Sequence, residues 1–255
     1  MPYTRTKEEI LAAIKQKPGI TAKEILARFN LTRAIIFRHL KGLQAHGKII
    51  KLGKTPKVSY FVREHLASTA EIDHKFFNWA LTGDNKFLKA GWLCSTRDTL
   101  QGRIEKLLKL LKNLIDENAL YSLVGAVAEI GNNSFDHNFG NWRDTPGALF
   151  AVDAKNRKIL LADRGQGVFA TIRKVRPKIS NDKEALRIAF TEIVSGRYPE
   201  QRGNGLKYVK KVVKENKLYL EFYSGCAAGK FSSMNMTIDE NPEKPVPGTL
   251  AIIKF

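Results

Sequence analysis

The chain has 255 residues, an apolar fraction of 43% and a formal net charge of +18, which suits one large domain or two small ones with ordinary cores. It has no run of about 18 apolar residues, and the N-terminal MPYTRTKEEI lacks the apolar core of a signal peptide, so neither a membrane span nor secretion is expected. With only Cys94 and Cys226, a disulfide framework or a zinc site is not expected either, and a cytoplasmic protein is predicted.

Basic charge is concentrated in the first quarter of the chain. Residues 1–66 hold 14 Lys and Arg against 4 Asp and Glu, a net charge of +10, and the remaining residues carry +8. This distribution favours a polyanionic partner for residues 1–66, with nucleic acid as the first choice and an anionic membrane surface as the second.

Three short helices are predicted at the N-terminus. Thr6 can cap KEEILAAIKQ, and Thr21 with Glu24 three positions later forms a capping box that starts AKEILARF. Thr32 can cap RAIIFRHLKGLQAH, and Gly47 ends it. Two strand-like runs, IIKL and VSYFV, follow around a basic turn and predict a hairpin. The apolar residues of the third helix expected to face inward are Ile36, Leu40 and Leu43.

Residues 5–63 therefore resemble a winged helix-turn-helix domain, and residues 1–66 are taken as a domain that binds double-stranded DNA. The third helix is expected in the major groove, and the turn of the hairpin is expected at the phosphate backbone. The alternative is a winged helix that binds protein and merely carries a basic face. The candidate DNA-binding residues are Thr32, Arg33, Phe37, Arg38 and Lys41 of the helix, and Lys54 and Lys57 of the turn.

Residues 67–104 are a connecting region whose structure the sequence does not specify. Their aromatic side chains, which include Phe76, Phe77 and Trp79, are dense enough to pack against another element. A helix is predicted from Asp98 or Thr99 to Asn118. Its leucine stripe is typical of a buried core face or of a dimer interface.

Polar residues interrupt an otherwise apolar helix, LYSLVGAVAEIGNNSFDH. At 100° per residue, Glu129, Asn133 and Asp136 fall within an arc of roughly 60°. Alone, this pattern fits an amphipathic helix with a solvated face as well as it fits a site.

Two glycine motifs follow. A predicted hairpin, ALFAV and KILLAD, ends in Asp163-Arg164-Gly165-Gln166-Gly167, where the glycines allow a ligand close to the backbone. After a basic segment with an embedded helix, NDKEALRIAFTEI, Gly203-Asn204-Gly205-Leu206 opens the helix LKYVKKVVKEN. Glycines at a helix start offer backbone N–H groups to an anion.

The order ExxxNxxDH, DxGxG and GxGL resembles the ATPase domain of gyrase, heat-shock chaperone, histidine kinase and MutL-type proteins (the GHKL superfamily), over residues 105–255. The resemblance implies an α+β fold, an α/β sandwich with a mixed, mostly antiparallel sheet covered on one face by helices. It also implies that residues 169–202 form a lid over ATP and that Mg²⁺ is a cofactor.

The resemblance also implies roles for single residues. Asn133 would bind Mg²⁺ through its amide oxygen, with a one-residue ambiguity from Asn132, and Asp163 would accept a hydrogen bond from the adenine amine. Glu129 would be the general base for hydrolysis. The remaining nucleotide-binding candidates are Asp136, His137, Gly165, Gly167, Gly203, Asn204, Gly205 and Leu206.

The chain departs from the histidine kinases, because residues 98–118 contain no histidine that could accept a phosphoryl group and offer one helix at most. The sequence is therefore interpreted as an ATP-binding transcriptional regulator, with a protein partner or a homodimer also possible. The alternatives are a Ser/Thr protein kinase resembling anti-sigma factors and a plain ATPase.

Overall fold

The computed structural model describes residues 2–17, 20–29, 31–46, 48–52, 58–62, 71–86, 88–193, 205–241 and 245–255. The chain divides into two compact units, Met1–His74 and Lys75–Phe255. Its described part is of the α+β class, and none of the helices in it is long and apolar enough to cross a membrane.

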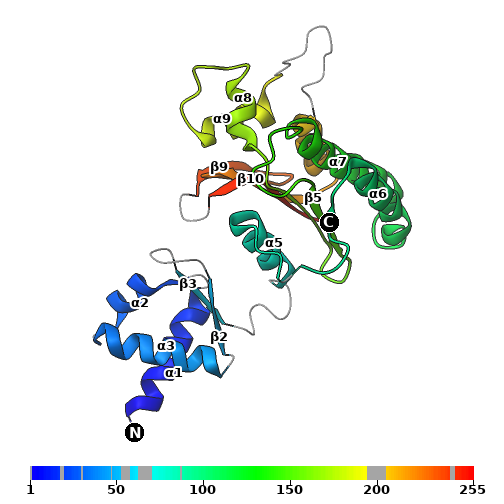
Figure 1. Ribbon diagram of the computed structural model, residues 1–255. Helices are drawn as coiled ribbons and strands as arrows, with labels where there is room; N and C mark the ends of the chain where they lie inside the picture. The colour runs from blue at the N-terminus through cyan, green and yellow to red at the C-terminus, as the bar shows by residue number, and fades with distance from the viewer. Residues whose placement is uncertain are drawn as a thin grey trace. The chain divides into compact units, whose positions relative to one another are not determined.

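Among its described residues, the first unit contains the helices α1 (Pro2–Gln16), α2 (Ala22–Arg28) and α3 (Arg33–Ala45) and a small sheet (Figure 1). The strands β1 (Ile20–Thr21), β3 (Ser59–Val62) and β2 (Ile49–Leu52) pair antiparallel in that spatial order. The predicted hairpin is confirmed by the β2–β3 pairing, whereas the strand β1 was not expected.

Local capping defines α2 and α3, whereas Thr6, predicted to cap the first helix, lies inside α1. Thr21 accepts from the backbone N–H of Glu24, whose carboxylate accepts from the backbone N–H of Thr21, so the predicted capping box is confirmed. Thr32 accepts from the N–H of Ile35 and caps α3 as predicted. The predicted inward residues of α3 are buried in a core shared by all three helices, which includes Ile10, Ile14, Ile25, Ile36, Leu40, Leu43 and Tyr60.

The second unit is built on a seven-stranded sheet in the order β4-β5-β6-β10-β7-β8-β9. Every strand pair among the described residues is antiparallel, so the prediction of a mixed sheet is wrong, although its mostly antiparallel character is confirmed. The strands are β4 (Leu93–Cys94), β5 (Ala148–Asp153), β6 (Lys158–Asp163), β7 (Tyr219–Gly225), β8 (Ala227–Phe231), β9 (Met236–Glu240) and β10 (Val246–Lys254).

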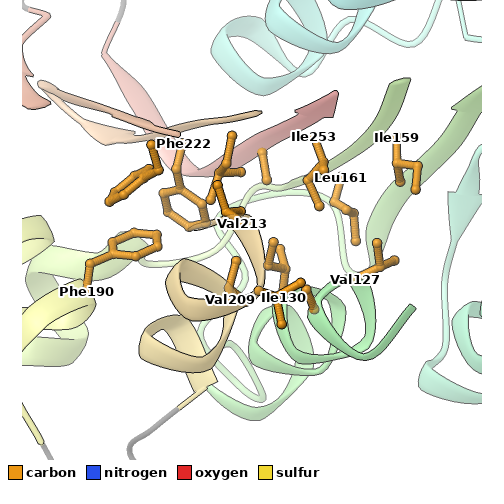
Figure 2. Packing of buried hydrophobic residues seen from close by; sticks show 14 of the residues in the cluster. Val127, Ile130, Ile159, Leu161, Phe190, Val209, Val213, Phe222 and Ile253 are labelled. Carbon is orange, nitrogen blue, oxygen red and sulfur yellow. The ribbon is translucent and has the colours of Figure 1, made fainter. Parts of the chain in front are cut away.

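Five helices cover one face of this sheet (Figure 1). They are α6 (Arg97–Leu111), α7 (Glu117–Asp136), α8 (Gly167–Arg173), α9 (Asp182–Thr191) and α10 (Gly205–Glu215). Val127 and Ile130 of α7 and Val209 and Val213 of α10 meet strand residues such as Leu161 in one continuous core (Figure 2). Removing such side chains from water is the main driving force for this layer, at roughly 1.5–3 kcal/mol for each large one.

α5 (Glu71–Thr82), in the region left unassigned by the sequence, packs against the opposite face of the sheet. Its Phe77 packs edge-on against Tyr223 of β7, with ring centroids 4.7 Å apart. Tyr223 alternates along β7 with Phe222, which belongs to the helical core, so the two rings point to opposite faces. Phe76 and Trp79 are fully buried, which confirms that the aromatic residues of this region pack.

Two helix boundaries differ from the prediction. α6 begins at Arg97 because Thr96, rather than Asp98, caps it, and it ends at Leu111 before a turn to α7. The leucine stripe is core at Leu100, Ile104, Leu107 and Leu111, while Leu110 and Leu114 are exposed.

Candidate functional site

Glu129 and Asn133 lie one turn apart on α7, on the side that meets the start of α10. An ideal Cβ built on Gly205, the first residue of α10, would lie 2.6 Å from Oε2 of Glu129 and 3.4 Å from Nδ2 of Asn133. A side chain at position 205 would therefore displace the carboxylate. The structure thus brings together a carboxylate, an amide and a helix N-terminus that are distant in the sequence.

Asn132 and Asn133 have different neighbours. Asn132 accepts a 2.8 Å hydrogen bond from the side-chain amide of Gln101 on α6. Its oxygen is therefore directed to the α6 side of α7, whereas Asn133 lies beside Gly205. Of the two amides, only that of Asn133 lies in the same place as Glu129.

Asp136 and His137, at the end of α7, do not join this group. The carboxylate of Asp136 forms an ion pair with Arg97 at the start of α6, and it lines a cavity of ≈ 530 Å³. His137 is the C-cap of α7, and its carbonyl accepts from the side chain of Gln166. The cavity is lined by Ser95, Thr96, Arg97, Phe135, Asp136, Phe139 and Trp142.

Asp163 ends β6 and is only 1% exposed. One carboxylate oxygen accepts from Nδ2 of Asn138 at 3.1 Å and from N–H of Gly165 at 2.9 Å. The other accepts from the hydroxyls of Ser134 and Thr249. Burial raises the pKa of Asp163 above its ordinary value of 3.8, and these hydrogen bonds oppose the rise. An adenine amine would have to replace one of these donors.

The glycines after Asp163 are required by close packing. An ideal Cβ on Gly165 would lie 1.9 Å from Cγ of Asn138, and Asn138 also accepts from N–H of Gln166 at 3.0 Å. Gly167 has a φ of +77°, and its Cβ would lie 2.8 Å from the carbonyl oxygen of Pro247. Asn138 therefore holds this loop against the end of α7.

Sequence reasoning missed four residues of this group: Ser134, Asn138, Gly248 and Thr249. Gly248 packs against the backbone of Asp163, since its Cβ would lie 2.3 Å from that residue's carbonyl oxygen. Ser134 lies on α7 on the side away from Glu129, and Asn138 follows four residues later, just after the helix. This i, i+4 pair of small polar residues is the signal that could have found them.

Arg164, between Asp163 and Gly165, has a side chain that is almost fully buried. Its guanidinium pairs with Asp144 and donates to the carbonyls of Trp79 and Ala80 at 3.1 and 2.6 Å. Those carbonyls belong to the last turns of α5. The loop after β6 is therefore bonded to α5 as well as to α7.

The basic segment predicted as a lid is folded over much of its length. α9 is capped by Asn181 as the predicted embedded helix, and its Leu186 and Phe190 are in the core. Phe190 packs against Phe222 and Phe231, with centroids 5.3 and 4.2 Å away. α9 is therefore anchored to the core on one side, and the lid role of residues 169–202 stays a prediction. Residues 194–204, which include Gly203 and Asn204, lie outside the described residues, and Leu206 is partly buried against the core.

The outward face of α3 carries the residues predicted to bind DNA. Arg33, Phe37, Arg38 and Lys41 are exposed, as is the capping residue Thr32. Lys54 and Lys57 lie outside the described residues. No acidic residue occurs between Leu31 and His46, so the exposed charges of this helix are all positive.

The residues beside Gly205 suit a phosphate and a hard cation. The N–H groups at the start of a helix favour an anion, and an amide oxygen and a carboxylate are ligands that Mg²⁺ accepts alongside water and phosphate oxygens. Within the described residues, no group of three or more His, Cys, Asp and Glu could hold a metal ion by itself. A cation here would therefore depend on the phosphates for most of its non-water ligands.

Comparison with known proteins adds no relative from which a role could be transferred. No family model matches the chain. A search of the curated proteins also found no match.

Proposed function

We propose that the protein is an ATP-binding transcriptional regulator with a winged helix-turn-helix first unit and a GHKL-type second unit, in which nucleotide binding modulates DNA binding. The observation that carries the nucleotide part is the approach of Glu129 and Asn133 to Gly205 at the start of α10. In the GHKL interpretation this is where the ExxxNxxDH motif meets the second glycine motif.

The side chains suggest a division of roles. The triphosphate would lie at the N-terminus of α10, and Mg²⁺, held by Asn133, would neutralise phosphate charge. Asp163 would receive the adenine amine in place of one of its four side-chain and backbone donors. Ser134 and Thr249 are the candidates for that exchange, because a hydroxyl can rotate toward another acceptor.

The DNA-binding part is supported by the uniformly basic face of α3 and by the charge of +10 on residues 1–66. Such a face attracts phosphates in a salt-dependent way. ATP binding and DNA binding would be linked if the protein had two conformations that differ in DNA affinity and if ATP bound one of them more tightly.

A DNA titration at fixed salt tests the regulator hypothesis. The full chain is titrated with fluorescent duplex DNA in the presence of ATP and Mg²⁺, of ADP and Mg²⁺, and of Mg²⁺ alone. We expect the dissociation constant to differ between the ATP and nucleotide-free conditions. Equal affinities in all three conditions, with ATP binding demonstrated separately by calorimetry, would refute the coupling.

An ATPase is the second candidate, and the position of Glu129 beside the proposed phosphate site favours it. If Glu129 activates water, then Glu129→Ala abolishes phosphate release and leaves ATP affinity nearly intact. Wild-type turnover in this variant would exclude that role. Transfer of radiolabel from ATP to a candidate protein partner would instead identify a Ser/Thr kinase.

A further inference from the structure

Arg33, Phe37 and Lys41 form one row on the exposed side of α3, because residues four apart share a helix face. Phe37 is 38% exposed and does not belong to the core of the first unit. The guanidinium carbon of Arg33 lies 5.4 Å from the centre of the Phe37 ring. In this row the cation of Arg33 therefore lies over the Phe37 ring, and the cation of Lys41 follows one helical turn later.

This row limits the chemistry of its partner. A ring surrounded by Arg33, Arg38 and Lys41, with no acidic residue on the helix, fits an apolar spot that is bordered by negative charge. In the major groove, the C5-methyl group of a pyrimidine is such a spot, because it lies between two phosphate backbones. Phenylalanine is among the side chains that contact this methyl group.

The geometry also selects the neighbouring base. A guanidinium above a ring keeps its N–H donors in its own plane and free to bind at the edges. Arginine binds the O6 and N7 acceptors of guanine with two such donors. The 5.4 Å between Arg33 and the Phe37 ring lies between one and two base-pair steps of about 3.4 Å, so the two side chains can reach neighbouring bases.

We propose that α3 reads a C5-methylated pyrimidine next to a guanine, with Phe37 on the methyl group and Arg33 on the guanine. The inference rests on the proposed DNA binding and adds the base step that is recognised. Thymine and 5-methylcytosine share the methyl group, and the test separates them. Lys41 and Arg38 contribute phosphate contacts that carry no sequence information.

The test uses the full chain and synthetic duplexes. A pool of duplexes with a randomised central segment is selected for binding at fixed salt. The tightest-binding duplex is then remade in two forms: one has deoxyuridine in place of the thymine, and the other has a pair of 5-methylcytosine and guanine in place of the thymine–adenine pair. We expect enrichment of a TG step and about fourfold weaker binding after loss of one methyl group, which corresponds to about 0.8 kcal/mol. The 5-methylcytosine duplex should bind as tightly as the thymine duplex if the methyl group alone is read, and more weakly if thymine O4 is also read.

Two variants separate base reading from general binding. Phe37→Ala should bind the thymine and deoxyuridine duplexes equally, and its binding of the deoxyuridine duplex shows that it is folded. Lys41→Ala should weaken both duplexes by the same factor and preserve their ratio.

Three results would overturn the proposal. Wild-type protein that binds thymine and deoxyuridine duplexes equally refutes the reading of the methyl group but leaves DNA binding in place. A Phe37→Ala variant that keeps the fourfold difference assigns the reading to another residue. Failure of the wild type to bind any duplex at low salt refutes both this inference and the DNA-binding part of the proposed function.

Discussion

Replacement of Gly205 by alanine should separate stability from activity. Gly205 does not have a positive φ, so alanine brings no backbone strain there, and alanine favours a helix over glycine by at most about 1 kcal/mol. The new Cβ would lie 2.6 Å from Oε2 of Glu129. The carboxylate would have to retreat by about 0.8 Å to reach ordinary contact, and a displacement of about 1 Å at a reacting group can cost about 100-fold in rate.

Gly102→Ala is the matched control, because Gly102 lies within α6 and a Cβ there would meet nothing within 4 Å. Thermal unfolding and phosphate release at saturating ATP are measured for both variants. We expect both to unfold within about 4 °C of the wild type. If Glu129 activates water as proposed, only Gly205→Ala loses phosphate release, by on the order of 10- to 100-fold. Phosphate release at the wild-type rate in Gly205→Ala would refute the placement of Glu129 at the reacting phosphate.

Three further predictions concern charged groups. Burial raises the pKa of Asp163, so its protonated form stabilises the fold most fully below pH 3.8, and this contribution is lost as the pH rises through the raised pKa. The melting temperature of the wild type should therefore fall between pH 4 and pH 8 relative to that of the Asp163→Asn variant. Arg164→Met should lower the free energy of unfolding of the second unit by about 3 kcal/mol, measured by tryptophan fluorescence in urea, since it leaves the Ala80 carbonyl without the Arg164 donor and Asp144 without its ion-pair partner. Hydrogen bonds from Lys17 and the Thr21 backbone hold the pKa of Glu24 at about 2. Glu24→Gln should therefore lower the free energy of unfolding by about 0.5–1 kcal/mol above pH 4.5, and this difference from the wild type should vanish as the pH falls through 2, as measured by circular dichroism in urea.

Features that depend on neighbouring residues were predicted well from the sequence. The capping box of Thr21 and Glu24 and the cap at Thr32 involve residues three apart, so the local pattern contains all the information that they need. The start of α6 was missed by a short distance, because Thr96, Asp98 and Thr99 are all acceptable caps and only the chain path from β4 selects Thr96.

Features that depend on topology were not predictable in the same way. The mixed sheet was expected from the GHKL resemblance and not from the pattern of residues along the chain. In the structure β10 is inserted between β6 and β7, so β6 and β7 both meet an antiparallel neighbour. That insertion depends on residues 246–254, and the residues around β6 contain no sequence pattern that predicts it.

In the candidate site, too, the local features were predicted and the features that depend on distant elements were not. Helical phase placed Glu129 and Asn133 together, but it also placed Asp136 with them, because it could not show that Arg97 on another helix would draw that carboxylate to α6. The donors to Asp163 come from α7 and β10, which no single motif spans.

The hydrogen bonds of Arg164 to the end of α5 connect residues 71–82 to the candidate nucleotide loop. The boundary between the two units lies inside this helix, and the carbonyls of Trp79 and Ala80 accept hydrogen bonds from Arg164, the residue after Asp163. A rearrangement of that loop on ligand binding would strain or release the C-terminal turn of α5 directly, without passing through the sheet core. The C-terminal turns of α5 are therefore held by the loop that carries the candidate nucleotide-binding residues Asp163 and Gly165.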